Sequence, residues 1–140
     1  MANLSLNPKA AASLALWHDM IAAQDFSKLP TILSDDAIFQ SPAVFKPYQG
    51  APVVALILNT VIQVFTDFEY DREFSSAEGL NVVLEFKAKV DDKLIHGIDM
   101  IRFNEAGLIT EFTVMIRPMS ALQTLAAEMG ARLAPYMPAQ

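Results

Sequence analysis

The chain contains no cysteine and only two histidines, His18 and His96. The lack of cysteine excludes disulfide bonds and thiol catalysis. Neither histidine belongs to an HxH or HExxH spacing, so the sequence offers no imidazole pair for a dedicated zinc site. We therefore predict neither a metal site nor a cofactor.

Positive charge is also scarce, because 10 Lys and Arg residues stand against 16 Asp and Glu residues, for a net charge of −6. Such a chain repels nucleic acid and anionic lipid, so neither is expected as a partner. The longest apolar run, Ala51–Leu58, is far shorter than the ~18 residues that a membrane span needs. No basic stretch precedes an apolar segment at the N-terminus, so we predict no signal peptide and a cytoplasmic location.

What the chain does have is apolar surface. Hydrophobic residues make up 53% of its 140 residues, and charged residues only 19%. This length predicts one domain over residues 1–140, with a core over about 8–133. The excess apolar surface must then be hidden in a core, a subunit interface or a ligand cavity.

The periodicity of apolar residues changes once along the chain. Spacings of three and four indicate helices up to residue 65, and alternation indicates strands after Thr66. Short turns between neighbouring strands predict an antiparallel sheet, and helices on one face of it make an α+β domain. The expected elements are helices over 8–23, 25–33 (interrupted by Pro30) and 52–65, a polar turn at 34–36, a short strand over 37–41, a loop over 42–50, four strands between 68 and 117, and a final helix over 120–133.

One acidic residue breaks the pattern of the strand expected over 94–103. Asp99 shares the odd-numbered face of this strand with apolar residues and a glycine, whereas His96 and Arg102 lie on the even face. Placing the odd face inside buries one charged group and the opposite choice buries two, so we predict that Asp99 lies inside. Burial is expected to raise the pKa of its carboxyl and make it a candidate acid or base. The alternative role is structural, as a cap of a backbone group or a partner of an arginine at the sheet rim.

The even face of this strand is apolar in its middle. Ile98 and Met100 are expected beside Thr113 and Met115 of the next strand. An apolar patch on the outer face of a sheet indicates a subunit interface, although scattered exposed apolar residues are common in monomers. We predict a homodimer formed through these four residues.

Three short motifs, in this order, resemble the NTF2-like superfamily and, within it, the SnoaL-like and ketosteroid-isomerase-like branch. They are DDAIFQSP at 35–42, YQG at 48–50 and IDMIRFN at 98–104, the last leading to Gly107. The resemblance covers about residues 8–133, and the order and spacing of the motifs are more specific than any motif alone. It implies an α+β cone, in which a curved sheet wraps around helices, encloses an apolar pocket and forms a dimer through its outer face.

The resemblance also implies roles for three residues. In ketosteroid isomerases a Tyr on the first helix and a protonated Asp on a strand hydrogen-bond to the substrate oxyanion, and an Asp before a Pro moves the proton. In this chain the strand acid falls on Asp99, the helix Tyr on Trp17 and the base on Ser41, just before Pro42. An indole is a donor only and a serine hydroxyl does not titrate near neutral pH, so ketosteroid isomerisation by the usual mechanism is not expected.

Three interpretations remain open. The first is a small enzyme of the isomerase, cyclase or lyase class that acts on an apolar, carbonyl-bearing metabolite through Asp99, Trp17 and Ser41. The second is a non-catalytic dimeric module that binds a small hydrophobic ligand, and the third is a dimer whose cone is filled by side chains. His18, beside Trp17, is a weaker candidate at the pocket rim. The expected ligand contacts are Tyr48, in the loop near the pocket mouth, and the apolar residues Val61, Phe65, Phe86, Ile101, Phe103, Phe112, Val114 and Ile116.

Overall fold

The computed structural model describes residues 5–137, and residues 1–4, where we predict no signal peptide, and 138–140, at the end of the chain, lie outside the described residues. No helix within 5–137 is long and apolar enough to cross a membrane. The elements in chain order are α1 (Pro8–Ala23), the 3-10 turn η1 (Leu29–Ile32), β1 (Leu33–Gln40), β2 (Tyr48–Gln49), α2 (Ala51–Val64), β3 (Thr66–Ser75), β4 (Asn81–Val90), β5 (Lys93–Phe103), β6 (Ile109–Arg117) and α3 (Met119–Leu133).

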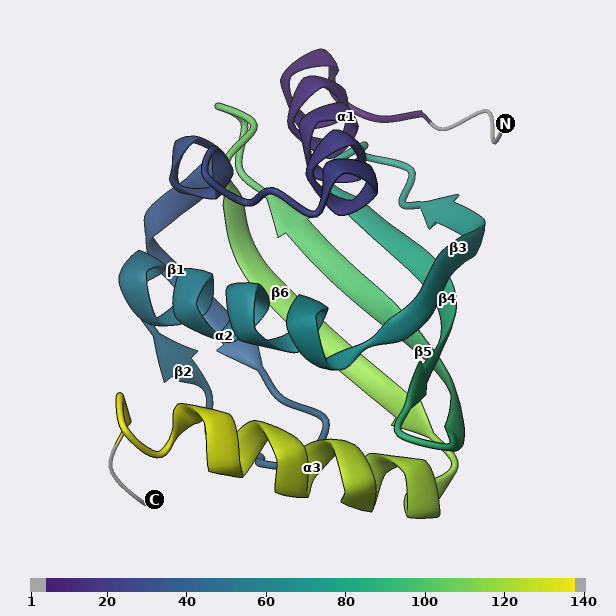
Figure 1. Ribbon diagram of the computed structural model, residues 1–140. Helices are drawn as coiled ribbons and strands as arrows, with labels where there is room; N and C mark the ends of the chain where they lie inside the picture. Colours follow the sequence, from purple (N-terminus) through teal and green to yellow (C-terminus); the bar gives the residue numbers. More distant parts are fainter. Residues whose placement is uncertain (1–4, 138–140) are drawn as a thin grey trace.

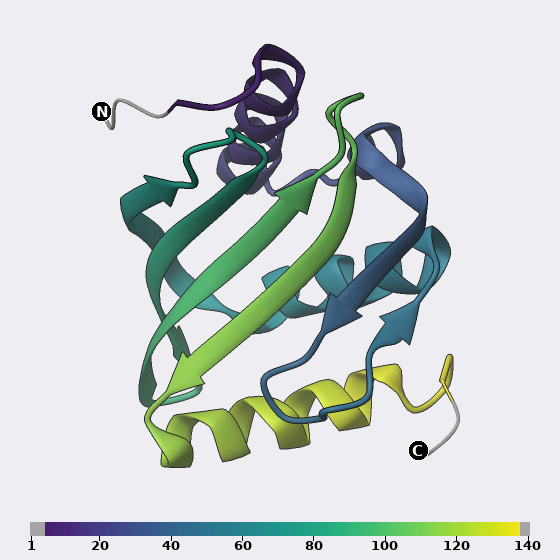
Figure 2. The same cartoon turned by 180° about the vertical axis from the view of Figure 1, so that it is seen from behind.

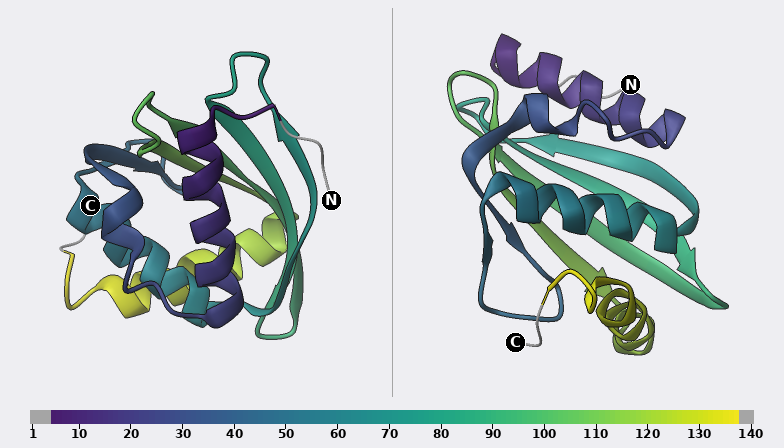
Figure 3. Two further views of the ribbon diagram at one scale, coloured as in Figure 1. Left: turned by 90° about the horizontal axis from the view of Figure 1, so that it is seen from above. Right: turned by 60° about the vertical axis from the view of Figure 1, so that its left-hand side comes forward.

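A six-stranded sheet in the order β2-β1-β6-β5-β4-β3 forms one layer of the molecule. Helices α1, α2 and α3 lie on one side of this sheet (Figure 1), and Figure 2 shows the opposite face of the strands in front of them. The sheet curves around the helices, which follow one another along its inner face (Figure 3). The α+β cone predicted from the sequence is therefore confirmed.

The prediction of a wholly antiparallel sheet is wrong for β1. Strands β3 to β6 pair antiparallel, because short turns join them. Strand β1 pairs antiparallel with β2 but parallel with β6, with Phe39 opposite Phe112. The chain reaches β6 from β1 through α2 and four further strands, β2 to β5, so no hairpin sets the direction of this pair. The sheet is mixed for that reason.

The segment before β1 also departs from its prediction. A helix over 25–33 is wrong, because helical structure there is confined to η1, which has Pro30 in its first turn. Strand β1 begins at Leu33 and includes residues 34–36, which were expected to form a turn. The pairing of β1 with β6 shifts register between Leu33 and Ile38, and such an irregularity hides the alternation that marks a strand in the sequence.

Helix α1 is held by the start signal that the sequence predicts. Asn7 Oδ1 accepts hydrogen bonds from the backbone N–H groups of Lys9 (2.9 Å) and Ala10, and Pro8 occupies the first turn. The buried side of the helix includes Trp17, which is 3% exposed. This packing directs the Trp17 side chain toward the sheet.

The odd-numbered residues of β5 lie inside, as predicted. Asp99 is 6% exposed, whereas Met100 on the outer face is 37% exposed. Gly97 allows a close approach within this layer, because a Cβ there would lie 2.6 Å from the Met115 carbonyl oxygen and 2.7 Å from the Phe86 ring. The alternation of inner and outer residues along β5 places Asp99 on the concave side of the sheet.

Candidate functional site

A cavity of about 480 Å³ lies between the inner face of the sheet and the helices. This volume falls within the range of small-molecule sites. Its wall is mainly apolar, and the polar side chains that reach it are Trp17, Ser41, Tyr48, Tyr70 and Asp99. Among the lining residues, all of which lie within the described chain, Asp99 carries the one carboxyl group.

Asp99 sits on β5 between apolar cross-strand neighbours, Leu84 of β4 and Val114 of β6. Burial raises the pKa of its carboxyl from 3.8 to about 7, and a hydrogen bond from Tyr70 lowers it in part. Both protonation states are therefore present near neutral pH. A group with this pKa can donate or accept a proton without a large free-energy penalty.

Tyr70 of β3 connects Asp99 to Trp17. The Tyr70 hydroxyl donates to Asp99 Oδ2 at 2.6 Å and accepts from Trp17 Nε1 at 2.9 Å. Burial, followed by the charge of Asp99, raises the pKa of Tyr70 well above its ordinary value of 10.0, so this hydroxyl keeps its proton. The indole N–H that the resemblance suggested as a donor to a ligand is thus directed at another side chain.

The second oxygen of Asp99, Oδ1, has no protein partner among the described residues. Among residues 5–137 no hydrogen bond reaches Asp99 Oδ1. No fully buried side-chain oxygen or nitrogen in that range lacks a hydrogen-bond partner, so Oδ1 must be accessible. Because Asp99 lines the cavity, that access comes from the cavity side.

The sequence analysis did not identify Tyr70 as a site residue, although strict alternation would put Tyr70 and Arg72 on the same face of a strand. In the structure Tyr70 lies opposite Phe86 and Glu73 lies opposite Leu84, so β3 carries one extra residue between these pairs. This irregularity turns Tyr70 inward and Arg72 outward. The signal that the sequence did offer is the Tyr70 hydroxyl, because a buried hydroxyl needs a hydrogen-bond partner. Alternation alone could not identify Asp99 as that partner.

Ser41 follows β1 at the edge of the cavity. Its Oγ accepts the backbone N–H of Ala43 at 3.0 Å, which fixes the start of the loop. Neither histidine is paired with it, since His18 contacts Glu73 at 2.6 Å and His96 contacts Glu85 at 2.7 Å. The position therefore lines the cavity without supplying a base.

The predicted ligand contacts divide into two sets. Tyr48, Val61, Phe65, Phe112 and Val114 line the cavity. The other four predicted contacts do not line it: Phe86, Ile101 and Phe103 are buried core residues, and Ile116 packs against the cluster around Leu125. Helix α3 contributes a lining stripe that the sequence analysis did not assign, made of Leu122, Leu125, Ala126, Met129 and Leu133 at helical spacing.

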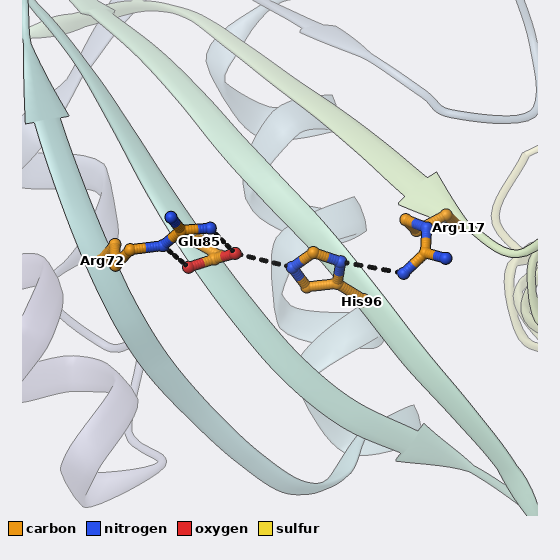
Figure 4. Close-up of polar contacts among 4 residues, drawn as sticks. All are labelled: Arg72, Glu85, His96 and Arg117. Atoms are coloured by element: carbon orange, nitrogen blue, oxygen red, sulfur yellow. Dashed lines mark hydrogen bonds and ion pairs between the residues drawn. The ribbon is translucent and has the colours of Figure 1, made fainter.

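A separate chain of polar side chains crosses the outer face of the sheet (Figure 4). Arg72 donates to both carboxylate oxygens of Glu85, at 2.6 and 2.8 Å, and His96 Nε2 contacts Glu85 Oε2. Arg117 lies 3.3 Å from His96 Nδ1. The bonds from Arg72, and then from His96, lower the pKa of Glu85 to about 2. Within residues 5–137 no group of three His, Asp or Glu side chains is arranged to hold a metal ion.

Comparison with known proteins places this geometry in a family. The SnoaL-like domain family matches residues 14–112. A steroid delta-isomerase from Pseudomonas aeruginosa is similar over 98% of this chain and 100% of its own, with 56% identity and a TM-score of 0.94. An uncharacterised protein with a cystatin-like fold from Silicibacter pomeroyi is 34% identical over 93% of this chain and 88% of its own, with a TM-score of 0.82.

More distant structures share the fold. An NTF2-like protein from Mesorhizobium loti has a TM-score of 0.70 at 13% identity, covering 80% of this chain and 93% of its own. The epoxide hydrolase/cyclase-like enzyme SalBIII has a TM-score of 0.66 at 14% identity, covering 81% of this chain and 93% of its own. No curated protein matches the chain. The chain therefore shares its fold with NTF2-like proteins, and the match over residues 14–112 establishes that it belongs to the SnoaL-like domain family.

Proposed function

We propose that this chain binds an apolar, carbonyl-bearing small molecule in its cavity and catalyses a reaction of the isomerase, cyclase or lyase class through proton transfer by Asp99. The observation that supports this proposal is one carboxyl group among the described residues that line a mainly apolar cavity, with one oxygen held by Tyr70 and the other facing the cavity. A desolvated acid costs stability, and such groups concentrate at functional sites.

The chemistry follows from the pKa of about 7 at Asp99. In its neutral form Asp99 donates a hydrogen bond to the ligand carbonyl and stabilises negative charge that develops on that oxygen. In its ionised form it accepts a proton from a carbon next to the carbonyl. General acid or base catalysis of this kind contributes roughly 10²–10⁴-fold in rate.

The second candidate function is a binding module that performs no reaction. It is favoured by Ser41, which leaves the cavity with Asp99 as its one carboxyl among the described residues. The similarity to a steroid delta-isomerase makes a Δ5-3-ketosteroid a reasonable first ligand. We propose that such a ligand can bind, but not that it isomerises by a mechanism that needs two carboxyl groups.

Deuterium exchange separates the two functions. The protein is incubated in D₂O with an apolar aryl ketone or the Δ5-3-ketosteroid, and exchange next to the carbonyl is followed by NMR. We expect exchange above the buffer rate with the unmodified protein and its loss in Asp99→Asn, with ligand binding retained. Asp35→Asn, at an exposed position of β1, is the matched control and should exchange normally. Binding without exchange in the unmodified protein would leave the binding module as the function.

We further propose that a second copy of the chain covers the outer face of the sheet. Met100 and Met115 are 37% and 49% exposed there, beside Ile98 and the buried Thr113. Phe45, in the loop after β1, is fully exposed and borders a groove that also includes Met115. These residues form an apolar centre on the outer face, and polar side chains flank it, as in many subunit interfaces.

Sedimentation equilibrium tests the dimer. Met115→Glu places a charge in the middle of the apolar patch and should shift the mass from dimer to monomer at micromolar concentration. Ala12→Glu, on the exposed side of α1, adds the same charge elsewhere and should stay dimeric. A monomeric unmodified protein, or a dimeric Met115→Glu variant, would contradict this assembly.

A further inference from the structure

Tyr70 is the central member of a hydrogen-bonded line that runs from α1 through β3 to β5. Trp17 Nε1 lies 2.9 Å from the Tyr70 hydroxyl, which lies 2.6 Å from Asp99 Oδ2. Trp17 and Asp99 are 3% and 6% exposed. The three side chains come from three different elements, so their alignment is a property of the fold rather than of a local segment.

The direction of this line is set by Trp17. An indole nitrogen donates a hydrogen bond and cannot accept one. The hydrogen of Tyr70 therefore cannot point to Trp17, and Asp99 Oδ2 is the one acceptor bonded to it among the described residues. A buried hydroxyl hydrogen without an acceptor is costly, so the arrangement in which Tyr70 donates to Asp99 is the favoured one.

This direction determines where Asp99 carries its proton. Oδ2 already accepts from Tyr70, whereas Oδ1 has no protein partner among residues 5–137 and faces the cavity. We infer that Trp17 and Tyr70 are positioning residues that keep the exchangeable proton of Asp99 on Oδ1, and that the ligand carbonyl meets this oxygen rather than the indole or the phenol. The ligand part of this inference rests on the function proposed above.

The surroundings of Asp99 contain few other groups that could redirect the proton. Its neighbours on β4 and β6 are Leu84 and Val114, and α2 and α3 present apolar side chains to the cavity. Two titratable groups beside the line are His18 of α1 and Glu73 of β3, which bind each other at 2.6 Å. The His18 ring meets the Tyr70 ring edge-on at 5.3 Å between centroids, and among residues 5–137 neither His18 nor Glu73 forms a hydrogen bond or ion pair with Asp99.

The proton movement is balanced without a cofactor. The Oδ1–H bond breaks, its electron pair stays on Asp99, and the proton forms a bond to the ligand carbonyl oxygen. The resulting carboxylate keeps the hydrogen bond from Tyr70 at Oδ2. This carboxylate then takes the proton of the carbon next to the carbonyl, and the C–H electron pair forms the C=C bond of the enol. Asp99 is thereby protonated again, so Asp99, Tyr70 and Trp17 end each cycle in their starting states.

Titration of the ligand-free protein tests the line directly. The Asp99 carboxyl carbon is followed by ¹³C NMR in the unmodified protein, Trp17→Phe and Tyr70→Phe. Loss of the bond to the carboxylate should raise the pKa of Asp99 in Tyr70→Phe by about one to two pH units. Trp17→Phe should raise it less, because Tyr70 still contacts Oδ2. Tyr48→Phe removes a hydroxyl that lines the same cavity without a hydrogen bond to Asp99, and should leave the pKa unchanged. An unchanged pKa in Tyr70→Phe would overturn the inference.

The indole proton gives a second readout. The chain has one tryptophan, so its Nε1–H resonance is unambiguous. In the unmodified protein this proton should resonate downfield and exchange slowly, because it donates to Tyr70, and it should move upfield and exchange faster in Tyr70→Phe. An indole resonance that does not respond to Tyr70→Phe would contradict the direction of the line.

Ligand binding tests the contact with Oδ1. Prodan, a naphthyl ketone whose fluorescence responds to polarity and hydrogen bonding at its carbonyl, serves as the probe. Tyr70→Phe and Trp17→Phe should retain most of the affinity, whereas Asp99→Leu should lose about tenfold with the hydrogen bond. Equal losses in Tyr70→Phe and Asp99→Leu would show that Tyr70 meets the ligand and overturn the assignment. If the unmodified protein binds neither prodan nor another ketone, the proposed function fails, while the ligand-free titration still decides the direction of the line.

Discussion

Replacing Asp99 by Asn should remove a pH dependence from the stability of this protein. Burial gives the folded chain a pKa of about 7 at Asp99, against an ordinary value of 3.8. Because the folded pKa is raised, the unfolded chain releases this proton first as the pH increases. The folded state is therefore penalised progressively between these two pKa values, and the full penalty applies above the higher one. The amide of an asparagine does not titrate, so Asp99→Asn escapes this penalty.

The size of the effect follows from the difference between the two pKa values of Asp99, 3.8 and about 7. Each pH unit between the two pKa values costs the wild-type chain up to about 1.4 kcal/mol, which amounts to about 4 kcal/mol in total. Below the ordinary pKa of Asp99, both states are protonated and the penalty vanishes. The difference in unfolding free energy between Asp99→Asn and wild type should thus rise by about 4 kcal/mol from acid to mildly alkaline pH, whatever its starting value.

Urea unfolding at several pH values measures this difference. Both proteins are unfolded at one fixed concentration from about pH 4 to pH 8, because dimer formation would otherwise change apparent stability. Asp35→Asn, an exposed change of the same type, should follow the wild-type curve. A difference between Asp99→Asn and wild type that stays constant across this range would refute the assignment of Asp99 as a buried acid with a raised pKa.

Three further changes test other parts of the molecule. Gly97→Ala should destabilise the fold by about 1–3 kcal/mol in urea unfolding, because the added Cβ meets Phe86 and the backbone of β6; wild-type stability would contradict this packing. Glu85→Gln should be less stable than wild type at neutral pH, and the two stabilities should converge in acid. The reason is that the bonds from Arg72 lower the pKa of Glu85 from 4.5 to about 2 in the folded chain. The stability that this ionised carboxylate provides is lost as the pH falls from 4.5 to about 2. Ser41→Asp places a carboxyl at the cavity edge and should accelerate deuterium exchange of a bound ketone by about 100-fold, whereas an unchanged rate would mean that this position does not face the reacting carbon.

Alternation in the sequence predicts the face of a strand, and β5 illustrates its success. One misplaced charge is less costly than two, which was sufficient to put Asp99 inside and Met100 outside. The order of elements and the start of α1 at Asn7 and Pro8 could be predicted for similar local reasons. In each case the signal depends on neighbours in the chain and needs no knowledge of distant contacts.

The parts that could not be predicted depend on irregular or distant pairing. Tyr70 reaches Asp99 because β3 contains an extra residue before Glu73, and no local signal announces that shift. Alternation also gives no position along the face, so Ile101 and Phe103 were assigned to the ligand surface although both belong to the packed core. The contribution of α3 to the cavity follows from how that helix docks, which the amphipathic pattern leaves open.

The two least exposed carboxyl groups of the described chain lie on neighbouring strands and differ sharply in their surroundings. Glu85 of β4 is 5% exposed on the outer face, and hydrogen bonds from Arg72 and His96 hold its pKa at about 2. Asp99 of β5 is 6% exposed on the inner face, where one hydroxyl group bonds it and its pKa is about 7. The same sheet therefore surrounds one carboxylate with cationic or imidazole donors and provides the other with a single neutral donor. Isolated buried acids reduce stability, so the lack of a cation at Asp99 among residues 5–137 leaves a carboxyl that can exchange its proton, as the function proposed above requires.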